Sequence, residues 1–371
     1  MSRKKQASVT IDTANPHTIK KFGLIETYVK GWAQKLLNYS NCEGIVFIDC
    51  MCNSGVYSGN DGSTVYGTPV RVSMILSEAM NNYPDKHADL YFNDLSADKI
   101  AILREQLPYD TSNFHIHTSD GDGNAFLKSF LLNPQTNFLL VYDPYEAAID
   151  WDAIVPFLNN WGEVIINHMV HDALRGIPQA KRPDVIAKYE ETYKANINDL
   201  LRFESNRAAF EHKIRDIISE QKLRTTRKYY VSSFPFFNRT NNLVYNLIHH
   251  TGNIEGFKLF KTTAWKTFGG KSSSKNTHGN EYQLVLDFTG GELTTDTDEN
   301  CYNINDIGKY LRDIFRGRDE VSFDEVYGVL DTHPVFPSDG FRHEIKRELK
   351  SYGVAISKAA MTFPDYQSEV R

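Results

Sequence analysis

Short apolar runs recur through the N-terminal half of the chain, and segments with helical periodicity separate them. The runs are rich in β-branched and aromatic residues: GIVFIDC (44–50), ADLYFND (88–94), NFHIHTSD (113–120), NFLLVYD (137–143) and EVIINH (163–168). Apolar residues spaced three and four apart predict helices over 18–37, 69–80, 96–107 and 150–160. Because strands that alternate with helices form a parallel sheet covered on both faces, the pattern predicts an α/β domain.

The second half of the chain predicts an insertion, a sheet edge and a smaller domain. The polar segment 171–228 is predicted to be helical, and 227–237 and 242–251 to form two antiparallel strands at the edge of the sheet. A helix over 255–268, a mobile loop over 269–280 that is rich in Gly, Ser, Lys and Asn, a strand over 281–288 and a linker over 289–300 follow. Two helical patterns, 304–315 and 338–353, precede VAISKAAMTF (354–363), which fits a β-wing. We therefore predict a large domain over 1–290 and a winged-helix-like domain over 300–371.

Charge and cysteine content exclude some partners and locations. The net charge of −6 gives no overall attraction for nucleic acid, so any nucleic-acid surface must be local. The cysteines at 42, 50, 52 and 301 fit neither a zinc knuckle nor a redox pair and are expected to be reduced. No apolar run approaches the roughly 20 residues of a membrane span, and the basic N-terminus lacks the apolar stretch of a signal peptide. A cytoplasmic protein without a membrane partner is expected.

Acidic residues follow the predicted strands, where open α/β sheets bind their ligands. Asp49 precedes a small-residue loop that contains Gly55, whose backbone could approach a ligand closely. Asp94 lies 45 residues after Asp49, beyond the roughly 20 residues of a dinucleotide fingerprint, which disfavours NAD. With no phosphate loop in the sequence, the pattern suits S-adenosylmethionine, with Asp94 on the ribose hydroxyls and Asp120 or Asp122 at the adenine edge. Any one of these acids could instead be a turn or helix-cap residue.

The segment VYDPYEAAIDW (141–151) is the most specific local signal. An Asp-Pro-aromatic turn at a strand end directs a carboxylate and a backbone carbonyl toward one point, beside a ring that can stack on a flat group. Such acceptors suit a planar amine that loses a proton on methylation. Asp143, Pro144, Tyr145 and Glu146 are therefore the candidate catalytic residues; the alternative is an ordinary turn with a packed tyrosine.

The order of several motifs resembles the three-Cys-motif partner family, TcmP. These motifs are NPHTIKKFGLIETYVKGW, VFIDCMCNSGVY, YGTPVRV, YFNDLS, DPYEAAIDW and NLVYNLIHHTGNIEGFKLF, which together extend along nearly the whole chain. The resemblance implies a Rossmann-like class I methyltransferase sheet, a winged-helix-like tail and a companion protein of the radical-S-adenosylmethionine type that carries its own three-cysteine motif. It assigns cofactor binding to positions that are, in this sequence, His17, Thr18, Lys21, Asp49, Asn53, Gly55 and Asp94.

Two motifs depart from the patterns that they resemble. Asn53 and Ser54 stand where the family's loop has glycine and proline. Asn tolerates a positive φ better than most residues, which keeps cofactor binding possible. The DPYE turn is similar to the DPPY turn of amino-directed nucleic-acid methyltransferases, with one proline missing.

Three further groups of residues have competing interpretations. His168 and His171 resemble a metal pair but lack a third ligand, so structural or substrate-contacting roles are favoured and no metal site is predicted. Phenylalanines 234, 236 and 237 are expected in the core rather than under a base. DNA or RNA could bind the helical insertion 171–228, or a basic helix of the last domain that could equally serve dimerisation.

The sequence thus favours an S-adenosylmethionine-dependent methyltransferase that acts on an amino group of a nucleic-acid base or a similar planar substrate. The alternative is a non-catalytic partner or nucleic-acid-binding module that retains the methyltransferase fold. The altered loop and the winged-helix-like tail motivate this alternative.

Overall fold

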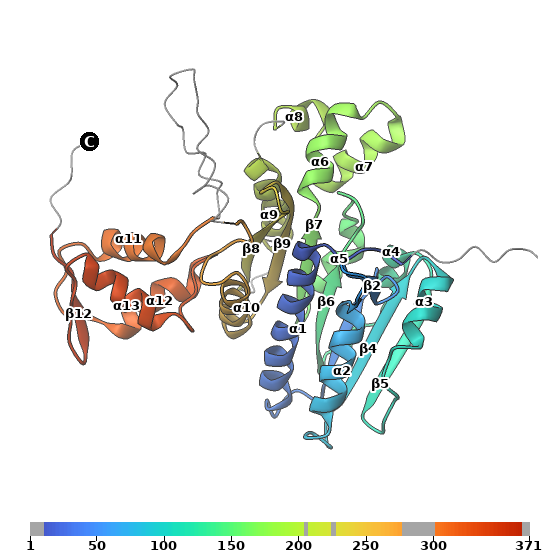
Figure 1. Ribbon diagram of the computed structural model, residues 1–371, viewed down its shortest axis with the longest axis horizontal. Helices are drawn as coiled ribbons and strands as arrows, with labels where there is room; N and C mark the ends of the chain where they lie inside the picture. The colour runs from blue at the N-terminus through green and yellow to red at the C-terminus, as the bar shows by residue number, and fades with distance from the viewer. Residues whose placement is uncertain (1–10, 204–206, 224–227, 277–300, 366–371) are drawn as a thin grey trace, which may run out of the picture.

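A seven-stranded sheet with helices on both faces is joined at one edge to a small, mainly helical domain (Figure 1). The computed structural model describes residues 11–203, 207–223, 228–276 and 301–365. None of the helices in these ranges combines the length and the apolar character needed to cross a membrane.

The strand order defines the fold of the large domain. The seven strands are β1 (Gly44–Asp49), β4 (His87–Asp94), β5 (Phe114–Asp120), β6 (Thr136–Tyr142), β7 (Gly162–His168), β8 (Tyr230–Phe237) and β9 (Leu243–Thr251). They lie in the order β5-β4-β1-β6-β7-β9-β8. The first five are parallel, whereas β9 runs antiparallel to both β7 and β8. This is the Rossmann-like sheet of class I methyltransferases, so the predicted fold class is confirmed, with the order reversing between β1 and β6.

Alternate residues of the central strands explain why their sequences are continuously apolar. Phe47 and Leu139 face one core, while Ile48 and Leu140 face the other, and all four are buried. The first core is covered by α1 (Pro16–Leu37), α2 (Thr68–Met80), α3 (Ala97–Arg104) and α10 (Ile254–Thr267). The second is covered by α4 (Gly123–Ser129), α5 (Trp151–Leu158) and the insertion helices α6 (Val170–Gly176), α7 (Pro183–Tyr193), α8 (Ile197–Leu201) and α9 (Arg207–Leu223). A strand that is buried on both faces has apolar residues at successive positions, because neither face meets solvent.

Two parts of the large domain differ from the prediction. Helix α4 and the hairpin of β2 (Val56–Ser58) and β3 (Thr64–Tyr66) were not expected. The predicted mobile loop is wrong over 269–276, because Ser272, Ser273 and Ser274 are buried and the backbone N–H of Ser272 donates to Tyr302 at 2.9 Å. The rest of that loop, the strand predicted over 281–288 and the linker over 289–300 lie outside the described residues.

The small domain has three helices rather than the two predicted. It consists of α11 (Ile304–Phe315), β10 (Val321–Ser322), α12 (Phe323–Thr332), α13 (Arg342–Ser351), β11 (Ala355–Ile356) and β12 (Ala360–Thr362), with sheet order β10-β12-β11. Helix α12 lies in the segment that we placed between two helices. The Ser322 side chain caps it by accepting from the Glu325 N–H, and Val326, Tyr327 and Leu330 are its buried face. The winged-helix assignment stays a prediction.

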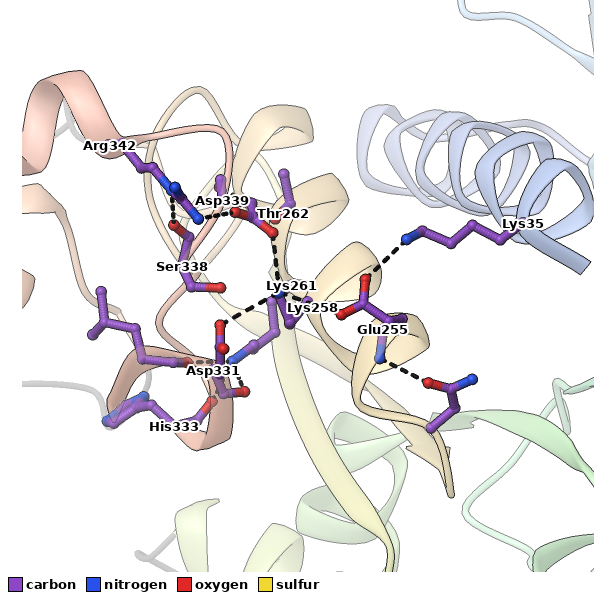
Figure 2. A network of polar contacts seen from close by, with 12 residues as sticks. Lys35, Glu255, Lys258, Lys261, Thr262, Asp331, His333, Ser338, Asp339 and Arg342 are labelled. Carbon is purple, nitrogen blue, oxygen red and sulfur yellow. Dashed lines mark hydrogen bonds and ion pairs between the residues drawn. The ribbon is translucent and has the colours of Figure 1, made fainter. Parts of the chain in front are cut away.

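Helix α10 fixes the small domain to the sheet domain (Figure 2). The Lys261 side chain is 0% exposed, and its ammonium donates to the carbonyls of Leu330 at 2.7 Å, Asp331 at 3.0 Å and His333 at 2.7 Å. The Trp265 indole N–H donates to the Val335 carbonyl at 2.9 Å. Because these contacts satisfy buried groups on both sides, the two domains have a defined relative orientation.

Candidate functional site

Three acids converge at the carboxyl edge of the sheet. Asp49 ends β1, Asp94 ends the neighbouring β4, and Asp143 follows β6 on the other side of β1. Asp49 and Asp94 are each only 4% exposed. Burial raises the pKa of Asp49 to about 8, and the negative charges of Asp143 and Asp94 add to the shift. Asp49 is therefore protonated at neutral pH, and a nearby cation would favour its ionised form.

Among the ion pairs of the described residues, Lys21 of α1 provides the cation at this cluster. It is buried, and its ammonium lies 2.5 Å from Asp143 Oδ2 and 5.1 Å from the centre of the Tyr245 ring. The other oxygen of Asp143 accepts from the side-chain amide of Asn167, at the end of β7. Helix α1 thus contributes a charge to the strand-end site.

The other residues of the N-terminal motif lie close by. His17 is half-buried against the Tyr245 ring, and its carbonyl accepts from the Tyr245 hydroxyl at 3.1 Å. Burial and the charge of Lys21 lower the pKa of His17, which favours the neutral imidazole. Thr18 is also half-buried.

Asp94 holds the loop that follows β1. One oxygen accepts from the backbone N–H of Asn53 at 2.9 Å, and the other accepts from that of Ser96 at 3.0 Å. Asn53 has a φ of 59° and Gly55 a φ of 66°, so Asn53 takes the left-handed conformation that asparagine tolerates. A Cβ atom at Gly55 would lie 2.6 Å from Leu103 Cδ1, so this position requires glycine.

A ring of polar contacts covers the loop from outside. The Asn53 side-chain amide donates to Asp12 at 2.8 Å and to the Tyr145 hydroxyl at 3.0 Å. Lys99 of α3 donates to the same two partners at 3.3 and 3.4 Å. Four chain segments therefore meet here, and we call Asp12, Asn53, Lys99 and Tyr145 the polar ring.

The remaining predicted site residues have separate surroundings. Asp120 pairs with Asp94 in the β4–β5 ladder but is exposed. Asp122 caps α4 by accepting from the Ala125 N–H at 2.7 Å, which is the helix-cap role given as its alternative. Glu146 is exposed and forms an ion pair with Lys188 of α7 at 2.7 Å. Its partner therefore lies on a different helix from Lys21, the partner of Asp143. Pro144 is buried.

Sequence reasoning missed Asp12, Lys99 and Asn167. Asn167 lies in a run that we had identified as a strand, so its position at the carboxyl edge was a usable signal. The sequence contained no such signal for Asp12 and Lys99, because their contacts with the loop join segments that are distant in the sequence.

Of the histidine and phenylalanine candidates, all but His171 are buried. His168 is buried, its Nε2 lies 2.8 Å from the Tyr193 hydroxyl, and burial lowers its pKa to about 3. His171 is exposed, and no group of three metal-ligating side chains occurs in the described ranges. Phe234 and Phe236 are 0% exposed in the first core, as expected.

A cavity of about 650 Å³ opens beside the site but contains none of the predicted residues. Residues of α4, α5 and α7 line it, including Lys128, Asp150 and Lys188. Lys128 pairs with Asp150 at 2.7 Å, and Lys188 pairs with Glu146. Because this cavity contains none of the strand-end acids, we keep the acid cluster as the candidate site.

Replacement of Asp49 by asparagine is expected to stabilise the fold at neutral and alkaline pH. Between pH 4 and 8 the unfolded Asp49 has lost its proton while the folded one keeps it, so the free energy of unfolding falls as pH rises. The asparagine variant does not lose stability in this way. Its free energy of unfolding should exceed that of the wild type by about 2 kcal/mol or more at pH 8. Urea unfolding across this range measures the difference; an identical pH profile for both proteins would contradict the prediction. Asp120→Asn, at an exposed strand end, is the control.

Comparison with solved structures gives matches at low identity and with TM-scores below 0.5. A Legionella pneumophila protein of the DUF519 family is 12% identical, with 68% of this chain and 92% of its own covered and a TM-score of 0.40. The SAH-bound Podospora anserina methyltransferase PaMTH1 is 12% identical, with 61% and 76% covered and a TM-score of 0.31. An rRNA methylase from Streptococcus thermophilus is 9% identical, with 62% and 94% covered and a TM-score of 0.29.

No protein-family model matches the chain, and no curated protein is significantly similar to it. The resemblance to TcmP therefore stays a prediction. The fold itself is defined by the strand order and the two cores described above.

Proposed function

We propose that the carboxyl edge binds S-adenosylmethionine and that the chain is a methyltransferase. The observation that carries the proposal is the convergence of three carboxyl groups, those of Asp49, Asp94 and Asp143, beside the buried ammonium of Lys21. S-adenosylmethionine carries a sulfonium, an ammonium and a carboxylate, so it is net positive and would complement a site of this kind. A neutral or anionic nucleotide would not.

The residues present fit this cofactor. Each oxygen of Asp94 accepts one backbone N–H, and a carboxylate has about four acceptor positions, so acceptors remain for two ribose hydroxyls. Asp49, held protonated in the absence of a cation, would ionise beside the cofactor's charged groups. The bound cofactor would supply an electrophilic methyl group.

The proposed substrate is a planar amine, such as the amino group of a nucleic-acid base. Asp143 would accept one of its N–H groups and orient the nitrogen, while Lys21 and Asn167 hold the carboxylate in place. Tyr145 has an exposed ring beside this position and would stack on the substrate. The resemblance to TcmP extends the proposal to a three-Cys-motif partner of the radical-S-adenosylmethionine type.

A second candidate is a binding module that does not use the cofactor. The polar ring favours it, because Asn53, Asp12 and Tyr145 already satisfy one another over the loop that a cofactor would contact. Cofactor binding would then require these contacts to rearrange.

Calorimetry with S-adenosylmethionine and S-adenosylhomocysteine, at about pH 7 and about pH 9, separates the two candidates. We expect S-adenosylmethionine to bind at least about 10-fold tighter, since the homocysteine form lacks the sulfonium charge. Its binding should release a proton from Asp49 at pH 7, and its affinity should rise with pH until Asp49 is ionised in the free protein near pH 8. The absence of heat with millimolar ligand at both pH values would favour the binding module.

A further inference from the structure

Helix α13 of the small domain carries its basic residues on one side. Ile345 and Leu349 form its buried face. At 100° per residue, the basic side chains cover the arc from one margin of that face to the solvent side: Arg342, His343, Lys346, Arg347 and Lys350. No acidic residue of the helix falls within this arc.

The acids of α13 lie on the opposite flank, toward α11. Glu348 accepts from the Asn305 side chain of α11 at 3.0 Å, and Glu344 precedes it by one helical turn. The charge of the helix is therefore separated into an acidic flank within the domain and a basic surface outside it.

The basic surface has side chains that form no ion pair. In the contacts of the described residues, Arg342 pairs with Asp339 at 2.8 Å and Lys346 lies over the Phe323 ring, but His343, Arg347 and Lys350 have no ion pair. All three are exposed.

Two of the three acids of the adjacent helix α12 are engaged elsewhere, and the third, Asp324, is exposed and forms no ion pair with α13 in the described contacts. Glu325 pairs with Arg318 at 2.7 Å, and Asp331 lies 3.7 Å from Lys258 of α10. The free cations of α13 thus remain available to a polyanion.

We propose that this surface of α13, with Arg347 and Lys350 at its centre, docks duplex DNA. A ten-residue helix with an exposed basic side fits the major groove of B-form DNA, whereas the major groove of A-form RNA is too narrow. Lys358, exposed in the turn between β11 and β12, would reach the flanking phosphates. The inference is independent of cofactor binding, because none of these residues belongs to the acid cluster.

The contacts of α10 would fix the orientation of bound DNA relative to the sheet domain. Lys258 and Lys261 bind the end of α12 and the segment before α13, and Arg342 continues the same network (Figure 2). A duplex bound by α13 would therefore be held in a fixed orientation to the sheet domain.

Fluorescence anisotropy of the full chain with a labelled duplex of about 20 base pairs tests the proposal. We expect affinity to fall linearly with salt on logarithmic axes between about 50 and 200 mM NaCl. Arg347→Glu and Lys350→Glu should each weaken binding at least about 10-fold and lower the salt slope by about 1. Lys30→Glu, the same charge change at an exposed position of α1, should leave both values unchanged.

Three results would overturn the inference: no salt-dependent binding, equal binding by the α13 variants and the wild type, or tighter binding to duplex RNA than to duplex DNA. Circular dichroism of each variant verifies that it is folded. Calorimetry with S-adenosylmethionine on the same α13 variants should match the wild type, so a failure of either proposal is distinguishable from a failure of the other.

Discussion

Replacement of Asp94 by alanine is expected to weaken the binding of S-adenosylmethionine by at least about 100-fold. A carboxylate that accepts from ribose hydroxyls contributes about 1.5–3 kcal/mol per charged hydrogen bond, and a factor of 100 corresponds to about 2.7 kcal/mol. The alanine variant also loses the acceptors for the backbone N–H groups of Asn53 and Ser96. Isothermal titration calorimetry measures the change.

Two further variants separate ribose binding from support of the loop. Asp94→Asn keeps an acceptor for one of the backbone N–H groups but removes the charge, so an intermediate affinity is expected. Asp85→Ala removes an exposed acid before the amino end of β4, away from the carboxyl edge, and should bind as the wild type does. Binding by Asp94→Ala within about twofold of the wild type would remove Asp94 from the cofactor site.

Replacement of Lys261 by methionine is expected to lower the free energy of unfolding by about 3 kcal/mol. The aliphatic stem is retained, but the carbonyls of Leu330, Asp331 and His333 lose their donor in a buried place. Urea unfolding measures the loss. Lys266→Met, at an exposed position of the same helix, is the control and should change stability by less than about 0.5 kcal/mol.

The effect of Lys261→Met should depend on pH. Burial lowers the pKa of the folded Lys261 to about 7, below its usual value of 10.5, so the unfolded state binds more protons between these limits. The wild type therefore gains stability relative to the methionine variant as pH rises above 7. A deficit that shrinks as pH rises, or a variant as stable as the wild type, would contradict this account of the lysine.

The sheet domain could be predicted because its main signals are local. Residues 44–48 are apolar on both faces of a strand, and the acids that end β1, β4 and β5 mark the carboxyl edge without tertiary information. Helix α4 was missed because it has only seven residues, of which Gly123 and Leu127 are the buried ones. The serines at 272–274 suggested a loop, and their burial depends on contacts with Pro235, Phe237 and Tyr302 that no local pattern encodes.

The candidate site could be predicted only in part for the same reason. Asp49, Asp94 and Asp143 were expected to meet because parallel strands end at one edge. The ion pair of Lys21 with Asp143 joins residues 122 positions apart, and the sequence motif indicated only that Lys21 belonged to the region. The polar ring was not predicted, since its members come from the N-terminal segment, a loop, a helix and a turn.

Helix α10 packs against both domains within one continuous hydrophobic core. Its Phe260 packs on Tyr28 and His249 in the sheet domain, while Trp265 contacts Phe336 and Phe341 of the small domain. A protein cut between the domains would leave this tryptophan and the amine of Lys261 facing water on the larger fragment. The domain boundary predicted from the sequence therefore divides the chain but not the hydrophobic core. The small domain could not be exchanged for another without changes in α10.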